Sequence, residues 1–83
     1  MKSMDILGSL LRFLNQLEAW RISYRLEHFR EDTLMVTLSV PGERWDVEFF
    51  ADGNIELEIF GSSSEVSSTS MEELIKRLEK HSG

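Results

Sequence analysis

The chain has 83 residues, of which 41% are hydrophobic and 29% are charged, so it is one small globular domain and too short for two. Nine basic and fifteen acidic residues give a formal net charge of -6, which opposes direct binding to nucleic acid or to an anionic membrane, because both attract basic surfaces. The absence of cysteine excludes a disulfide framework and a thiolate metal site. No apolar run approaches the roughly 18 residues of a membrane-spanning helix and no signal peptide is recognisable, so we expect a cytoplasmic protein.

An amphipathic helix is predicted over residues 4–20, with Ser3 as its N-cap. Apolar side chains recur there at three- and four-residue spacing, which is the period of one helix face; they are Ile6, Leu7, Leu10, Leu14, Leu17 and Trp20. Leu11 and Phe13 widen this stripe. A stripe so wide is either buried against a sheet or shared with a second subunit, and this makes Leu11 and Phe13 candidates for a homodimer interface.

Residues 24–60 change to a period of two, which is typical of strands. The turn-forming pairs Glu31-Asp32, Pro41-Gly42 and Asp52-Gly53 divide this segment into four short strands. The pattern therefore predicts a four-stranded antiparallel meander.

Residues 61–69 are nearly all small and polar, and we expect them to form a flexible Ser-rich linker. Ser70 and Glu73 then form a capping box at the start of a last helix over residues 70–81. The order of helix, four strands and helix predicts an α+β fold in which both helices cover one sheet face and leave the other face open.

The turn before the fourth strand decides which side chains share a face. A two-residue loop, Asp52-Gly53, would place Phe49 opposite Glu56 and mix core and solvent faces. A three-residue loop, Ala51-Asp52-Gly53, places Phe49 opposite Ile55 and is a common hairpin connection. We therefore predict the three-residue loop.

The same register gathers carboxylates on the open face. It pairs Glu48 with Glu56 and Asp46 with Glu58, although like charges directly opposite each other destabilise a sheet. Residues 31–60 hold eight acids against one base, so the acidity is confined to this part of the sheet.

Two interpretations of these carboxylates stay open. They can form a docking patch for a basic protein, since opposite charge steers association and aromatic side chains supply affinity. They can also be ordinary polar cover for an exposed sheet face, where acidic side chains discourage aggregation between sheet edges. The candidate partner-binding residues are Asp46, Glu48, Glu56 and Glu58, with Arg44 and Phe60 at the rim.

Signatures of catalysis and of metal binding are not found in the sequence. His28 and His81 have no second histidine or cysteine at ligand spacing. The carboxylates lack a calcium-loop motif, and the serines of residues 62–70 lack a nucleophile elbow. We expect no metal, no cofactor and no enzymatic activity.

Residues 40–60 combine a hairpin, Pro41-Gly42-Glu43-Arg44-Trp45, with an Asp52-Gly53 turn and an acidic strand. Over about residues 20–60 this pattern resembles a group of short uncharacterised bacterial proteins, some of them in the style of toxin-immunity proteins. The resemblance implies a small bacterial protein that acts by binding, and it transfers no site residues.

Together these features lead us to expect a small acidic binding domain of the immunity or inhibitor type. Its open sheet face would neutralise a basic protein partner, such as a toxin or a nuclease. The alternative is a structural or adaptor module without enzymatic activity, which forms a homodimer through the surplus apolar face of the first helix or through an edge strand.

Overall fold

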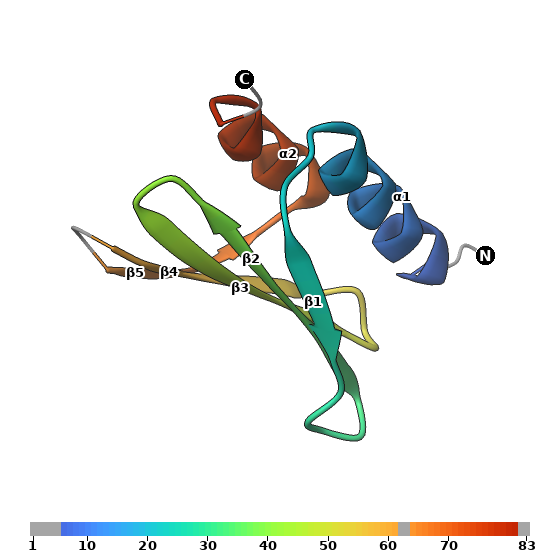
Figure 1. Cartoon of the computed structure of the whole chain (residues 1–83). Coiled ribbons are helices and arrows are strands. Elements are labelled where there is room, and N and C mark those ends of the chain that lie inside the picture. The colour runs from blue at the N-terminus through green and yellow to red at the C-terminus, as the bar shows by residue number, and fades with distance from the viewer. Residues whose placement is uncertain (1–5, 62–63, 82–83) are drawn as a thin grey trace.

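The computed structural model describes residues 6–61 and 64–81 of the chain. In chain order the elements are α1 (Ile6–Ala19), β1 (Tyr24–Glu27), β2 (Thr33–Val40), β3 (Glu43–Phe50), β4 (Ile55–Phe60), β5 (Glu65–Thr69) and α2 (Met71–Glu79). The strands form one antiparallel meander in sequence order, so β1 and β5 are its edges. Both helices lie over one face of the sheet (Figure 1). The predicted α+β fold with one open sheet face is confirmed, with a fifth strand in addition to the four expected.

Helix α1 buries one side and ends in a left-handed turn. Phe13 and Leu17 are fully buried, because they lie on the stripe that repeats every three or four residues. The Ile22 amide donates to Leu17 O at 2.9 Å, and Arg21 between them has a φ of 60°. This arrangement commonly closes a helix, usually with glycine at the left-handed position. The predicted first residues of this helix, 4 and 5, lie outside the described part of the chain.

The hairpin between β3 and β4 has the three-residue loop that the alternation predicts. The Phe50 amide donates to Asn54 O at 2.9 Å, and Gly53 has a φ of 95°, a conformation that glycine adopts without steric cost. Phe49 consequently lies opposite Ile55, and both side chains are buried. The predicted register is confirmed.

The prediction of a flexible linker over residues 61–69 is wrong for Glu65–Thr69, which forms strand β5. This strand pairs antiparallel with β4, and none of its residues is fully buried. Its small polar side chains therefore reflect an exposed sheet edge. Polar composition by itself did not reveal the strand, because backbone hydrogen bonds to β4 require no apolar side chain.

Gly61, at the end of β4, also has a packing role. A Cβ on this residue would lie 2.8 Å from Gly42 O and 3.0 Å from Glu43 Cγ. No side chain fits there, because the chain passes directly against the turn between β2 and β3. The glycine that suggested flexibility in the sequence is required by this close approach.

Helix α2 begins with the predicted capping box. The Glu73 amide donates to the Ser70 hydroxyl at 3.2 Å, and this bond satisfies one of the amides at the helix start. Leu74 and Leu78 lie on the side that faces the sheet and are fully buried.

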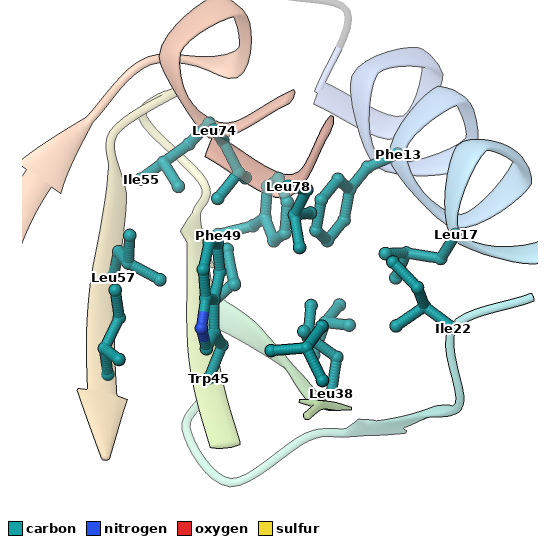
Figure 2. Close-up of a cluster of buried hydrophobic side chains, with 14 of the residues drawn as sticks. Phe13, Leu17, Ile22, Leu38, Trp45, Phe49, Ile55, Leu57, Leu74 and Leu78 are labelled. Carbon is teal, nitrogen blue, oxygen red and sulfur yellow. The ribbon is translucent and has the colours of Figure 1, made fainter. Parts of the chain in front are cut away.

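A single apolar core fills the space between the helices and the sheet (Figure 2). The ring centroids of Phe13 and Phe49 are 5.5 Å apart. Trp45 is 2% exposed and its indole donates to Glu43 Oε1 at 2.9 Å, so the polar atom of a buried tryptophan is satisfied. Within residues 6–61 and 64–81, no helix is long and apolar enough to cross a membrane.

Candidate functional site

The open face of the sheet carries four carboxylates from two neighbouring strands, which we call the acidic cluster: Asp46 and Glu48 of β3, and Glu56 and Glu58 of β4. Because successive side chains of a strand point to opposite faces, these four alternate with buried residues of the core. Glu48 pairs with Glu56 and Asp46 with Glu58. The structure therefore brings all four predicted carboxylates together, on the side away from both helices.

Glu48 is the most covered member of the acidic cluster, at 8% exposed. Its Oε2 lies 3.5 Å from Nε of Arg30, which stands in the connection between β1 and β2. Met35 is its partner on β2. Glu48 is thus already compensated by a cation of its own chain, although the Arg30 side chain is 63% exposed, which weakens the pair through solvent screening.

Asp46 also has partners within the chain. Its Oδ1 accepts from the Thr37 hydroxyl at 3.2 Å and lies 3.5 Å from Nε of Arg44. Its side chain is 21% exposed. Asp46 and Glu48 are therefore held in place by the sheet and are only partly available to another molecule.

Arg44 and Phe60, predicted at the rim, contact each other. The Arg44 guanidinium lies 4.3 Å from the centroid of the Phe60 ring, a cation–π contact worth about 0.5–1 kcal/mol at an exposed position. The two residues are paired across β3 and β4. Phe60 is half-buried, so much of its ring is covered within the chain.

Glu56 and Glu58 differ from the other two carboxylates. Both are exposed, and among the described residues neither lies within 4.0 Å of a basic side chain. On β5, Ser68 lies opposite Glu56 and Val66 opposite Glu58. Val66 is 71% exposed, an apolar side chain beside two free carboxylates.

Between the acidic cluster and its neighbours lies a shallow hollow of about 50 Å³, bordered also by Met35, Leu57 and Val66. Its volume is far below the roughly 300–1,000 Å³ of small-molecule sites. The hollow is therefore too small to enclose a small-molecule ligand. Sequence reasoning missed Val66 because the segment that contains it was interpreted as a linker; the β-branched residue between polar ones was the available signal.

In the described part of the chain, no group of three or more histidine or acidic side chains is arranged to hold a metal ion. His28 is exposed in the connection after β1. His81, after α2, lies edge-on to Trp45 with ring centroids 5.9 Å apart, and its Nε2 is 3.8 Å from Glu43 Oε1. The two histidines thus have separate surroundings.

The proposed dimer candidates on α1 do not share a face. Leu11 is 50% exposed, and Leu7, one turn earlier, is 65% exposed. Phe13 is fully buried because it points at Phe49 in the core, and its assignment to a homodimer interface is wrong.

Comparison of the chain with models of protein families, with curated proteins and with solved structures finds no match. The resemblance to bacterial proteins in the style of toxin-immunity proteins stays a prediction.

Proposed function

We propose that this chain is a small protein-binding domain of the immunity or inhibitor type, which covers a basic surface of a partner protein with the open face of its sheet. The observation that carries the proposal is the placement of Glu56 and Glu58. Both are exposed, both are free of basic side chains in the described chain, and both lie opposite another carboxylate. Like charges in this position lower the stability of a sheet, and a cationic partner would relieve that repulsion.

The four carboxylates have different parts in this proposal. Glu48 lies beside Arg30 and Asp46 lies beside Arg44. These two carboxylates are therefore fixed in position and are less exposed than Glu56 and Glu58. Glu56 and Glu58 extend from the same face and supply the contacts to lysine or arginine side chains of the partner.

Val66 provides the apolar component. An interface gains affinity when apolar side chains are desolvated at its centre, whereas charges at the rim mainly raise the association rate. Val66 stands directly beside Glu58, so a partner with basic residues around an apolar side chain is the chemistry that fits.

The test uses a lysine- and arginine-rich peptide with one leucine, titrated into the isotope-labelled protein and followed by NMR. Amide shifts should change on β4 and β5 and not on the helices. The variant Glu56→Gln/Glu58→Gln should weaken binding by roughly 2–30-fold, because an exposed ion pair contributes about 0.2–1 kcal/mol, and it should flatten the salt dependence.

The matched control is Glu72→Gln/Glu73→Gln, which changes the net charge equally on exposed positions of α2. This control variant should bind the peptide with most of the affinity of the wild type. If both double variants weaken binding to the same extent, the peptide responds only to net charge, and the proposed face is wrong.

A further inference from the structure

Within residues 6–61 and 64–81, no strand pairs with the outer edge of β5. The alternating hydrogen-bond pattern of the sheet shows which backbone groups lie along this edge. In an antiparallel sheet the N–H and C=O of one residue point to the same neighbour, and successive residues alternate. The hydrogen bond from the Phe50 amide to Asn54 O shows that the backbone N–H and C=O groups of even-numbered β4 residues point to β3. Those of odd-numbered β4 residues therefore point to β5. With Leu57 opposite Ser67, the backbone groups of Val66 and Ser68 point to the free edge.

An independent bond confirms this phase. The Ser39 amide donates to Ser23 O at 3.2 Å, toward β1. When the alternation is followed from this bond across β2 and β3, through the residue pairs of the sheet, the backbone groups of Phe50 and Asn54 again point toward each other. The orientation of Val66 and Ser68 therefore follows from two separate observations.

The β5 edge also lacks the features with which proteins protect sheet edges. Such edges usually carry lysine, proline, a bulge or an unpaired charge, or they are very short. The other edge, β1, has four residues and carries Arg25 and Glu27. β5 has five residues, and Glu65 is its one charged residue. This carboxylate already has a partner in the chain, because Arg77 donates to both of its oxygens at 2.8 and 2.9 Å.

We propose that β5 pairs antiparallel with β5 of a second copy of this chain, about a two-fold axis at Ser67, so that one sheet continues through both copies. Only even-numbered residues of β5 direct their backbone N–H and C=O groups outward, so the two strands can pair only in registers that place even-numbered residues opposite each other. Of these, the register centred on Ser67 is the one that pairs all five residues of the strand. It places Val66 opposite Ser68 and Glu65 opposite Thr69, so no charged side chain meets a like charge directly.

The symmetry determines where the other elements lie. A two-fold axis between antiparallel strands of one sheet is perpendicular to the sheet, so the faces are preserved. The helices of both copies would lie on one side and both acidic clusters on the other. The pairing itself does not depend on what the acidic cluster binds.

The first test places a cysteine on the axis. Residue 67 would form a pair that is not hydrogen-bonded, with Cα atoms about 4.5 Å apart, which is within the 4.4–6.8 Å range of a disulfide. Because the chain has no cysteine of its own, Ser67→Cys should give a linked dimer on mild oxidation. The control, Ser39→Cys at an exposed position of β2, should link much more slowly, and equal rates would overturn the proposal.

The second test removes one outward amide. Proline is tolerated in an edge strand where its missing N–H would face solvent, so Ser68→Pro should keep the circular dichroism spectrum and cooperative melting of the wild type but raise the dimer dissociation constant at least tenfold. Ser68→Ala keeps the amide and should still dimerise in sedimentation equilibrium.

Three results would contradict the pairing: a monomeric wild type at hundreds of micromolar, a dimer that persists in folded Ser68→Pro, or a dimer that Ser68→Ala also abolishes. Peptide binding measured on monomeric Ser68→Pro reports on the acidic cluster alone. The failure of one proposal is thereby separated from the failure of the other.

Discussion

Glu48 and Glu56 lie opposite each other on neighbouring strands, yet their surroundings differ. Glu48 is 8% exposed and has Arg30 as a partner, whereas Glu56 is exposed and has no such partner in the described chain. Polar cover alone explains exposed carboxylates on an open face, but it does not favour a like-charged residue opposite each of them. The arrangement at Glu56 and Glu58 is therefore the residue-level feature that supports the proposed binding face over ordinary polar cover.

The repulsion can be measured through stability. Glu56→Lys replaces a like-charged cross-strand pair with an opposite-charged pair, and Glu58→Lys does the same against Asp46. We expect each substitution to raise the free energy of unfolding by roughly 0.2–1 kcal/mol, which is a few degrees in melting temperature for a domain of this size. Thermal unfolding followed by circular dichroism measures the effect.

The control for this prediction is Glu72→Lys, which makes the same charge change in the first turn of α2. It should lower the melting temperature slightly, because an acidic residue near a helix start is stabilising. A lower melting temperature for both β4 variants would show that Glu56 and Glu58 are structurally satisfied.

At the level of elements, two apolar residues of α1 that are close in sequence lie on different sides of the helix. Phe13 packs on Phe49, while Leu11 is half exposed. Phe13→Ala should lower the free energy of unfolding by about 3–5 kcal/mol, because it leaves a cavity in the core. Leu11→Ala should change it by less than about 0.5 kcal/mol. Urea denaturation measures both free energies, and a large loss for Leu11→Ala would indicate that Leu11 contacts a second molecule.

Glu65 and Arg77 connect β5 to α2, and this link is pH-dependent. The bidentate hydrogen bonds from Arg77 lower the pKa of Glu65 below its ordinary value of 4.5. A lowered folded-state pKa contributes stability that is present above the unfolded pKa and is lost as the pH falls through the folded value. The contribution of this pair should therefore be present at neutral pH and decrease as the pH falls below the ordinary pKa of Glu65.

The test compares urea denaturation at about pH 7 and about pH 3. Glu65→Gln lacks the titrating carboxylate, so it should lose less stability between the two pH values than the wild type. An unchanged pH dependence in Glu65→Gln would mean that the ion pair does not couple β5 to α2.

At the scale of the whole molecule, the fold separates the apolar helix layer from the acidic sheet face. The helices and the inner sheet face enclose the core (Figure 2), and the acidic cluster lies on the far side. If two copies join through β5, both acidic clusters lie on one surface, and a partner with two basic patches would gain affinity from the second contact. A small chain can in this way present a binding surface larger than its own sheet.

The sequence by itself determined the features that depend on neighbours along the chain. Apolar spacing of three and four residues predicted the first helix, the capping box predicted the start of the last helix, and alternation with turn residues predicted the meander. The parity of the Ala51-Asp52-Gly53 loop predicted which carboxylates face each other. These predictions succeeded because side-chain period and loop length are local properties, and a register error of one residue would expose the whole core face.

Only the tertiary structure decided the features that depend on segments distant in the chain. The pairing of Glu48 with Arg30 and the strand at Glu65–Thr69 depend on which distant residues lie beside each of them in the fold. No local period along the chain encodes these contacts. The polar edge strand β5, for example, is held by backbone hydrogen bonds to β4 and by the hydrogen bond from Arg77 to Glu65, and neither requires an apolar pattern. For the same reason the free edge of β5, and with it the proposed contact between two copies, became visible only in the folded chain.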